Sequence, residues 1–583
     1  MPLRWSVHRH DADLVRSIEQ TCKVSPVVAQ ILAVRGLTHP TEVSSFLDLK
    51  MTGLRGPNEL PGIDQAVEHI ARAISDKRKI VVYGDYDCDG MTSTAILYRC
   101  IKLLGGNVSY FVPSRLDDGY GVSKDSLQKL KDRGAEFIIT VDCGVTSVTE
   151  AEFAKELGLT MVITDHHVPG PKLPDVAAIV HPALPGNEYA FKDLCGAGVA
   201  FKLAWALCQH QHGSEKLPTA MRNFLFAAIS LAAIGTVADV VPLLDENRII
   251  VNHGLNLLRD FANPGLKHLI HLAGMSDKPK LGAEDIAFMI GPRLNAAGRL
   301  GQAQLGVELL TIETDDRAKA LAEYIEQLNK SRDSLDRSIL RSANKQIKEN
   351  YDVSIEPALV LASTDWHVGV IGIVAGRIAE KYHRPTVLIS IDKLGQKPAT
   401  GSGRSACGVD LLTAISGCRE FLVKCGGHRA AAGLSIDPDK IDEFREAFCH
   451  QVTLQTATQE LIPELDIDAE ARLSQLTIHT LNELEKLAPF GQGNPRPVMC
   501  VSNVKLARAP KTMGKEDRHL DLQLQQQDVR IRAVGFGKGE WVQDLADEGG
   551  NFDFAFKPVI NEFNGRRKVE LHLVDYRKSN SQI

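Results

Sequence analysis

Short apolar runs alternate with amphipathic stretches between residues 79 and 180. Runs of this length are typical of strands, and the stretches between them have the spacing of helices that cover a sheet. Strands are expected from about 79 and at 108–112, 137–141, 161–164 and 177–180, with a helix at 91–104. This order predicts a doubly wound α/β domain with a parallel sheet.

The pattern changes further along the chain. Residues 196–330 carry long apolar faces at helical spacing, and they run into a charged, proline-free helix that ends near 350 and that we interpret as a rigid connector. A second α/β unit is expected from about 358 to 435. Alternating short strands between 464 and 576 predict a small β-barrel.

Length and composition agree with a globular protein of several domains, since 583 residues exceed what one hydrophobic core usually supports. The net charge of −6 argues against a generally basic nucleic-acid coat protein, although it leaves room for a local positive groove. The eleven cysteines show no CxxC spacing, so neither a zinc ribbon nor a disulfide framework is indicated. The predicted parts are a lead-in at 1–60, the first α/β domain at 61–310, the connecting helix at 311–350, the second α/β domain at 351–455 and the barrel at 456–583.

The sequence also bears on where the protein acts. No apolar run approaches the roughly 20 residues that span a bilayer, and the N-terminus lacks the apolar core of a signal peptide. We therefore expect a cytoplasmic protein with no membrane partner.

Acids and histidines follow the predicted strands and one later apolar helix. Because the carboxyl ends of parallel strands meet at one edge of a sheet, these side chains should converge. Carboxylates gathered in one crevice repel one another unless a cation neutralises them, and mixed carboxylate and imidazole ligands suit Mn²⁺ or Mg²⁺. The candidates are Asp85, Asp87, Asp89, Asp142, Asp165, His166, His167 and Asp239.

The motif GDYDCDG is a weak signal by itself, because aspartate-rich glycine loops also bind calcium or face water. The further acids in VDCG, DHH and GTVAD favour one shared centre over separate solvated loops. A carboxylate that bridges two ions roughly 3.5–4 Å apart would let them polarise a phosphoryl oxygen and activate water.

Possible phosphate ligands lie beside small residues that allow close backbone approach. Arginine next to glycine-rich turns suits an anionic backbone better than an ordinary surface ion pair. The candidates are Arg115, Arg293, Asn295, Arg299, Ser402, Arg404 and His428. Basic residues also occur among the C-terminal strands, but acidic residues nearly balance them, so the barrel could bind single strands or a protein partner.

The motifs DYDCDG, VDCG, TDHH and GTVADVVPL resemble those of the DHH phosphoesterase superfamily, and GPRLNAAGRL, GSGRS and GGHRAAAGLS resemble the further signatures of its RecJ family. The resemblance extends from about residue 30 to 576. It implies a two-lobed DHH core, with a catalytic domain and a DHH-associated substrate-binding domain joined by a long helix, followed by an OB-like nucleic-acid-binding barrel.

The same resemblance implies a role for each candidate residue. One metal would be held by Asp87 and Asp142, and a second by Asp89, Asp142, His166 and Asp239. His167 would contact the scissile phosphate or support the metal shell, while Asp85 and Asp165 would orient ligands or water. Several superfamily members place a histidine ligand where this chain has Tyr83, so the first metal site is expected to be weaker or completed by water.

The implied function is a 5′→3′ exonuclease that releases 5′-mononucleotides from single-stranded DNA in recombination and repair. A DHH phosphodiesterase for short oligonucleotides or cyclic dinucleotides is the catalytic alternative, and a catalytically inactive DNA-binding scaffold is the alternative from another class. The long C-terminal region argues against the phosphodiesterase, because a dinucleotide needs no extended groove. The nearly complete set of metal-site acids argues against the inactive scaffold. A monomer is expected, with a single-strand-binding protein and a RecQ-type helicase as partners.

Overall fold

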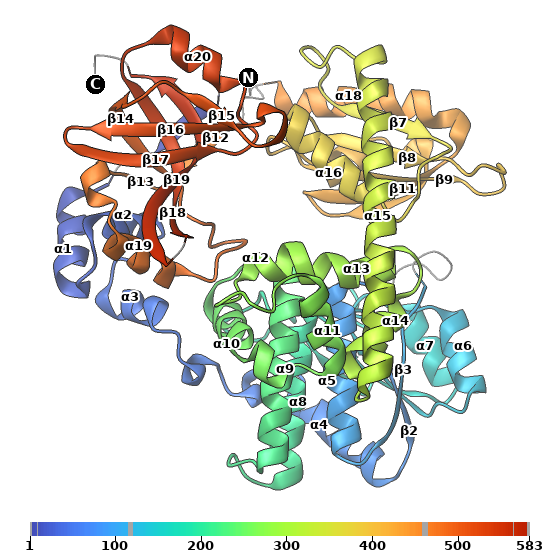
Figure 1. Cartoon of the computed structure of the whole chain (residues 1–583). Coiled ribbons are helices and arrows are strands. Elements are labelled where there is room, and N and C mark those ends of the chain that lie inside the picture. The colour runs from blue at the N-terminus through green and yellow to red at the C-terminus, as the bar shows by residue number, and fades with distance from the viewer. Residues whose placement is uncertain (1–2, 9, 115–120, 458–463, 564, 580–583) are drawn as a thin grey trace. The chain divides into compact units, whose positions relative to one another are not determined.

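The computed structural model (Figure 1) describes residues 3–8, 10–114, 121–457, 464–563 and 565–579. Contacts divide the chain into two compact units, one of residues 51–462 and one that combines residues 1–50 with 463–583. The larger unit contains two α/β lobes and the long helix between them, and the smaller unit contains the C-terminal barrel.

The first lobe is built on a parallel sheet with the strand order β3-β2-β4-β5-β6. Its strands are β2 (Lys79–Tyr83), β3 (Asn107–Phe111), β4 (Phe137–Val141), β5 (Thr160–Thr164) and β6 (Ala178–Val180). The chain passes from β2 to β3 on one side and returns to β4 on the other. The topological switch point, where such sheets bind ligands, therefore lies between the carboxyl ends of β2 and β4.

Helices connect these strands and cover the sheet. They are α4 (Ile63–Ser75), α5 (Cys88–Leu103), α6 (Lys124–Asp132) and α7 (Val148–Glu156). Helix α5 begins earlier than the expected residue 91 because the Asp87 carboxylate accepts a hydrogen bond from the Gly90 N–H at 3.0 Å and caps the helix. The acids of the first motif thus lie at a helix N-terminus, where negative charge is stabilised.

A helical layer completes this lobe. It comprises α8 (Gly196–His212), α9 (Thr219–Ala238), α10 (Asp245–Phe261), α11 (Pro264–Leu272), α12 (Ala283–Asp285), a π-helical turn (Ile286–Ile290), α13 (Gly291–Arg299) and α14 (Ala303–Thr311). Together with the sheet, these helices bury one large hydrophobic cluster.

Helix α9 has the length and apolar composition of a membrane span, contrary to the expectation that no such run exists. The sequence analysis missed it because Arg222 and Asn223 near its start shorten the uninterrupted apolar run. In the structure α9 is mostly buried and packs against α5, α8 and α10, so it is a core helix of this lobe.

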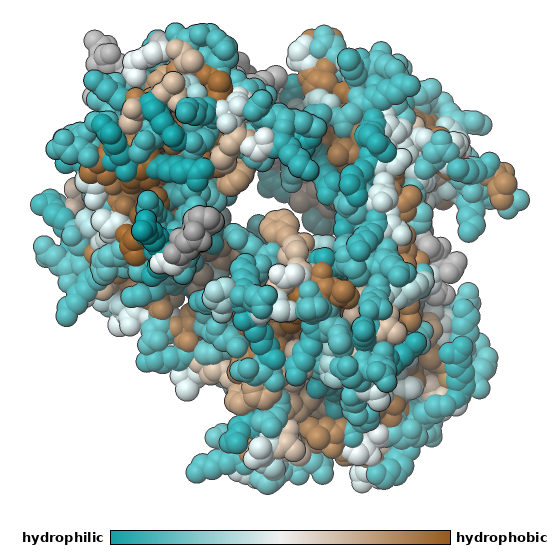
Figure 2. Space-filling model, viewed as in Figure 1, coloured by the Kyte–Doolittle hydropathy of each residue, from teal (hydrophilic) through white to brown (hydrophobic). Residues whose placement is uncertain are grey.

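On the face drawn in Figure 2, hydrophilic residues cover most of the surface.

The second lobe follows the single helix α15 (Asp315–Asn350), which runs unbroken between the lobes (Figure 1). Its N-terminal half buries side chains such as Leu321 in the first lobe, and its C-terminal half buries side chains such as Ile339 in the second. The second sheet has the order β10-β11-β9-β8-β7. Its elements are β7 (Leu359–Ser363), α16 (Ile371–Tyr382), β8 (Thr386–Ser390), β9 (Ala399–Arg404), α17 (Leu411–Ser416), β10 (Leu422–Gly427), β11 (Ala431–Ile436) and α18 (Ile441–Thr456).

The smaller unit contains a closed barrel. Strands β14, β18, β19, β17 and β16 pair in sequence, and β16 pairs again with β14 through Lys505 and Leu506. Closure of five strands in this way is the OB architecture, which confirms the predicted barrel. Its elements are β12 (Glu464–Ile467), β13 (Ala469–Glu470), α19 (Ile478–Leu484), β14 (Met499–Leu506), β15 (Lys511–Met513), β16 (His519–Gln526), β17 (Val529–Gly535), α20 (Trp541–Glu548), β18 (Phe552–Phe563) and β19 (Arg566–Lys578).

The N-terminal segment packs with this barrel and shares its core. Its elements are β1 (Arg4–Val7), α1 (Ala12–Cys22), α2 (Pro26–Val34) and α3 (Pro40–Leu47). Strand β1 pairs in parallel with β12, and Val28 and Ile31 belong to the same hydrophobic cluster as Leu522. Residues 1–50 therefore form part of the barrel unit, a long-range association that the local pattern of a lead-in does not reveal.

Candidate metal centre

The predicted acids and histidines gather at the switch point of the first sheet. Asp85 and Asp87 follow β2, and Asp142 follows β4. Three sets of possible ligand atoms lie within 4.8 Å of one another: Asp85 with Asp87 and Asp142, Asp89 with His166 and Asp239, and Asp142 with His166 and His167. Asp142 and His166 each belong to two sets, so the three sets form one continuous centre.

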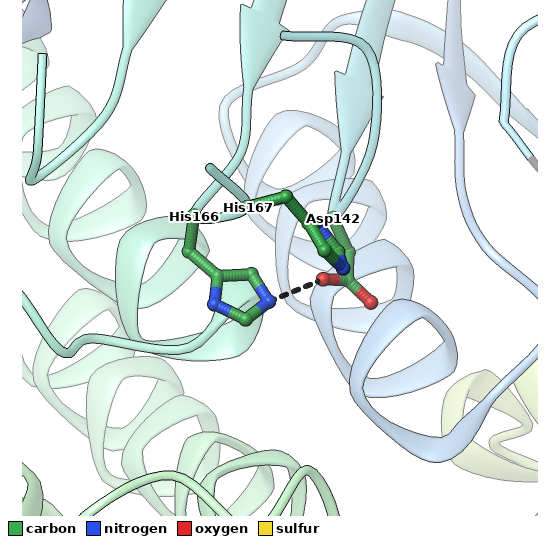
Figure 3. Close-up of side chains that lie close together, drawn as sticks. All are labelled: Asp142, His166 and His167. Atoms are coloured by element: carbon green, nitrogen blue, oxygen red, sulfur yellow. Dashed lines mark ion pairs between the residues drawn. The ribbon is translucent and has the colours of Figure 1, made fainter. Parts of the chain in front are cut away.

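The imidazole of His166 faces several carboxylates, and Figure 3 shows its approach to Asp142. Its Nε2 atom lies 3.1 Å from Asp142 Oδ1, 3.6 Å from Asp239 Oδ2 and 3.8 Å from Asp89 Oδ2. His166 Nε2 and Asp142 Oδ1 are buried, and neither has a hydrogen-bond partner among the described residues. Burial lowers the pKa of His166 to about 4, so the neutral ring offers a lone pair. A divalent cation between these atoms fits the donor set.

Crowding of the carboxylates favours the same conclusion. Burial, followed by the negative charge of Asp89, raises the pKa of Asp142 well above its ordinary value and that of Asp239 to about 9. The pKa of Asp87 is raised for the same two reasons. A bound cation would reverse this effect, because it favours the ionised form of each carboxylate.

The Asp89 carboxylate is held by the N-terminus of α8. It accepts hydrogen bonds from the N–H groups of Gly196 at 2.7 Å and Ala197 at 2.9 Å. A Cβ atom on Gly196 would lie 2.7 Å from Asp142 Oδ1, and one on Gly235 would lie 2.4 Å from Asp89 Oδ1. The centre therefore requires glycine at both positions. The sequence analysis missed Gly196, although LCGAG before an apolar helix was a visible signal.

Asp142 has an unusual backbone conformation. Its φ of 61° lies in the left-handed region, which few residues other than glycine adopt. Its N–H donates to the Thr164 carbonyl at 3.0 Å and so ties the end of β4 to the end of β5. Strain of about 1–3 kcal/mol at such a position persists only where the surrounding structure enforces it, and such positions cluster at functional sites.

Asp165 organises the histidine motif. Its carboxylate accepts hydrogen bonds from the Val145 N–H at 2.9 Å, from the N–H groups of His166 and His167 at 2.7 and 3.1 Å, and from the ring Nδ1 of His167 at 2.8 Å. Burial alone would raise the pKa of Asp165, but the bond to His167 holds it at about 2. Burial alone would lower the pKa of His167, but Asp165 raises it to about 9. The two side chains therefore form an ion pair at neutral pH.

His181 supports the same loop, and the sequence analysis did not select it. Its Nε2 donates to the His167 carbonyl at 2.7 Å, and its Nδ1 accepts from the Ala183 N–H at 2.9 Å. The two bonds fix one neutral tautomer, which agrees with a pKa lowered by burial. Its position just after β6, at the same edge of the sheet as the candidate acids, could have identified it.

Three family models match the chain: the DHH family N-terminal domain at residues 79–229, the DHHA1 domain at 353–453 and the RecJ OB domain at 467–575. The single-stranded-DNA-specific exonuclease RecJ of Bacillus subtilis strain 168 is 38% identical over 583 residues, which are 100% of this chain and 72% of the relative. RecJ of Salmonella typhimurium strain LT2 is 33% identical, with 99% of each chain covered. The chain belongs to the RecJ family.

Solved RecJ structures have the same fold. RecJ of Thermus thermophilus in complex with Mn²⁺ gives a TM-score of 0.84 at 30% identity and covers 99% of this chain and 80% of that chain. The same protein in complex with Mg²⁺ gives a TM-score of 0.77 at 28% identity and covers 99% of this chain and 79% of that chain. The resemblance and the fold class expected from the motifs are thereby confirmed.

In this RecJ-family chain Tyr83 lies in a hydrophobic cluster with Val122 and Ile138. Its hydroxyl donates to the Gly121 carbonyl at 3.0 Å, and its ring lies 5.2 Å from that of Phe111. Tyr83 therefore stabilises the fold at the position where a histidine ligand was considered. The weaker first metal site stays a prediction.

The phosphate candidates of the first lobe make internal contacts. The Arg293 guanidinium pairs with Glu326 at 2.7 Å and so braces α13 against α15. The Asn295 side-chain oxygen accepts from the Cys88 N–H at 2.8 Å and holds the start of α5. Arg299 Nη1 donates to the Gly369 carbonyl at 3.2 Å, which links α13 to the chain that precedes α16. The first two contacts hold α13 within the first lobe and the third joins it to the second lobe, and phosphate binding by the three residues stays a prediction.

The candidates of the second lobe are Ser402, Arg404 and His428. Arg404 Nη1 donates to the Ser402 hydroxyl at 3.1 Å and to the Gly403 carbonyl at 2.7 Å, so the serine and the arginine act as one group. His428 is exposed and accepts from the Ala430 N–H at 3.3 Å. Arg115 lies outside the described residues.

A basic groove of about 1540 Å³ lies on the barrel of the RecJ-family chain. Its lining includes Arg508, Arg530, Arg532, Arg566 and Lys568. Asp521 pairs with Arg532 at 2.7 Å, and Glu570 pairs with it at the same distance. Part of the positive charge is therefore neutralised within the groove.

Proposed function

We propose that this RecJ-family protein is a metal-dependent exonuclease that degrades single-stranded DNA from the 5′ end and releases 5′-mononucleotides. The relatives that match over nearly the whole chain are named single-stranded-DNA-specific exonucleases. The observation that carries the proposal is the convergence of carboxylates and His166 around Asp142. The direction of digestion and the product rest on the resemblance of the motifs.

We assign the centre two divalent cations, Mn²⁺ or Mg²⁺, the ions present in the related Thermus thermophilus structures. The proposed ligands are Asp87 and Asp142 for the first ion, and Asp89, Asp142, His166 and Asp239 for the second. When bound, such ions supply Lewis acidity to a phosphodiester and to water. Asp85 shares a set with Asp87 and Asp142 and would orient these ligands.

The residues around the proposed ions would stabilise the scissile phosphate and bind the DNA strand. His167, which Asp165 keeps protonated at neutral pH, would stabilise negative charge on the scissile phosphate. The Ser402 and Arg404 group would bind a phosphate of the strand, with His428 and Arg115 as further donors. Arg299 and Asn295 would contribute from the first lobe, and Arg293 would fix the orientation of α13. The barrel groove would hold single strands through its cations.

The cellular setting rests on the resemblance to the RecJ family. The partners that this resemblance implies are a RecQ-type helicase, which would expose single strands, and a single-strand-binding protein. The proposed setting is DNA recombination and repair in the cytoplasm, with the protein acting as a monomer.

The deciding experiment is digestion of a long single strand labelled separately at the 5′ or the 3′ end, with Mn²⁺, Mg²⁺ or a chelator. The 5′ label should be released at once as mononucleotide, the 3′ label should persist until late, and the chelator should stop both. An intact long strand beside cleaved dinucleotides would assign the protein to the small-substrate phosphodiesterases. Binding without cleavage under all metal conditions would indicate an inactive DNA-binding protein.

Asp165→Asn should lower kcat on single-stranded DNA about 10- to 100-fold, the range seen when partners of ligating groups are removed. The neutral amide no longer holds the positive charge of His167, so the pKa of His167 falls toward its ordinary value. Steady-state digestion at pH 8 measures the effect. Asp175→Asn, which removes an exposed ion pair with Lys155 in the same lobe, should leave kcat unchanged. Equal rates for the two variants would contradict the role of Asp165.

A further inference from the structure

Asn247 is a buried amide in the first turn of α10, outside the centre itself. Its Nδ2 donates to the Asp193 carbonyl at 2.6 Å and to the Pro242 carbonyl at 3.0 Å. Both neighbours are acceptors, so only a group that donates two hydrogens satisfies them. Its Oδ1 has no hydrogen-bond partner among the described residues, so the side chain is engaged through its donors.

The two carbonyls belong to segments next to one set of proposed metal ligands, because one segment supports Asp89 and the other carries Asp239. Asp193 lies just before the N-terminus of α8, whose first N–H groups hold the Asp89 carboxylate. Pro242 lies shortly after Asp239, which is the C-cap residue of α9. Asn247 therefore joins the support of Asp89 to the backbone of Asp239, and both acids face His166.

The segment after Asp239 needs such a clamp. Val240 has a φ of 62°, in the left-handed region that is strained for a β-branched residue, and the residue is 64% exposed. No burial of its own side chain holds Val240 in this conformation. The hydrogen bond from Asn247 to Pro242 is a direct restraint on this segment.

Asn247 is itself held rigidly by the residue that precedes it. The buried Glu246 carboxylate accepts hydrogen bonds from Lys202 Nζ at 2.5 Å, from the Arg55 N–H at 2.9 Å and from the Tyr189 hydroxyl. These bonds fix the start of α10 to α8 and to the loop before α8. Because the start of α10 is held in place, the hydrogen bonds of Asn247 restrain the positions of Asp193 and Pro242.

We propose that Asn247 is a positioning residue of the metal centre, which sets the separation of Asp89 and Asp239 and so the affinity of the ion that they share with His166. The proposal rests on the proposed function, because it assumes that this set binds a divalent cation. Asn247 touches neither the ion nor the substrate.

The test compares Asn247→Asp with Asn263→Asp in the full chain. Asn263 also donates through Nδ2 to two backbone carbonyls, those of Leu309 and Ile312, and it lies in the same unit. Its helix-capping oxygen, which accepts from the Leu266 N–H, is retained in the aspartate. The two variants therefore lose equivalent hydrogen bonds, and only one of them lies between ligand supports.

Binding of Mn²⁺ is measured by electron paramagnetic resonance of the free ion, and thermal melting is measured beside it. Asn247→Asp should weaken one class of Mn²⁺ site about 10- to 100-fold, and excess Mn²⁺ should restore part of kcat. Asn263→Asp should keep the wild-type affinity although it loses two hydrogen bonds of the same kind. Wild-type affinity in Asn247→Asp, or an equal loss in both variants, would overturn the proposal.

Two further results separate the proposals from each other. If Asn247→Asp does not fold, Asn247→Ser, which keeps one donor, takes its place and must still weaken Mn²⁺ binding. If the wild type binds Mn²⁺ and Asn247→Asp weakens that binding, but no single strand is degraded, then the positioning role stands and the exonuclease assignment fails. If the wild type binds no Mn²⁺, both fail.

Discussion

Replacing Asp142 with asparagine should lower the rate of single-strand digestion about 10³-fold or more, the loss expected when several kcal/mol of metal-dependent transition-state stabilisation are removed. Asp142 belongs to the set with Asp87 and to the set with His166, so one substitution weakens both proposed metal sites. No other described acid lies in two of these sets. The effect should therefore exceed that of replacing any other single ligand.

The same change should not destabilise the metal-free protein. Burial and neighbouring acids raise the pKa of Asp142, so its ionised form opposes folding at pH values above its ordinary pKa. A neutral amide removes that repulsion, and the melting temperature in chelator should stay equal or rise. Below the ordinary pKa of aspartate both side chains are neutral, so the difference in melting temperature should vanish there.

Rates of digestion with Mn²⁺ and melting curves with chelator measure the two effects in one preparation. Asp285→Asn is the matched control, because Asp285 is buried and acidic but pairs with Lys278 at 2.7 Å, outside the ligand sets. It should retain activity. Substantial digestion by Asp142→Asn, or a loss of activity that merely follows unfolding, would contradict the assigned role of Asp142.

The convergence of the candidate acids could be predicted because they follow the strand ends directly. The apolar runs that become β2, β4 and β5 are bounded by Asp85, Asp142 and Asp165, and a parallel sheet brings such positions to one edge. Asp239 was selected in the same way, since it directly follows the apolar helix α9. Local sequence pattern and sheet topology are enough to predict a candidate residue that lies at the end of a strand or helix.

The supports of these ligands could not be predicted in this way. Gly196 is required by the close approach of Asp142, and Asn247 is required by two distant carbonyls. The two carbonyls that Asn247 contacts leave no local signature, and the LCGAG motif marks Gly196 as a small residue before a helix without showing that Asp142 lies against it. The pairing of Arg293 with Glu326 was hidden for the same reason, because a lone arginine near a glycine predicts a phosphate as readily as a partner carboxylate.

Gly196→Ala should lower kcat about 100-fold, the loss expected when a catalytic geometry shifts by about 1 Å. The added Cβ would lie 2.7 Å from both Cβ and Oδ1 of Asp142, far inside ordinary van der Waals contact. Asp142 is buried and strained, so it has little room to yield. If α8 shifts instead, the N–H groups that hold Asp89 move with it. Either response displaces a proposed ligand.

Digestion rates across a Mn²⁺ titration test this steric effect, with circular dichroism to show that α8 and the fold persist. Alanine favours helix more than glycine does, so helix propensity opposes any loss of stability at the first residue of α8. Gly282→Ala is the matched control, because its Cβ would meet only Asp285 Oδ2 at 3.9 Å. The control should keep wild-type rates. If Gly196→Ala also kept them, the centre would have to tolerate a displaced Asp142 or Asp89, and its metal affinity could not depend on the tight geometry of these two ligands.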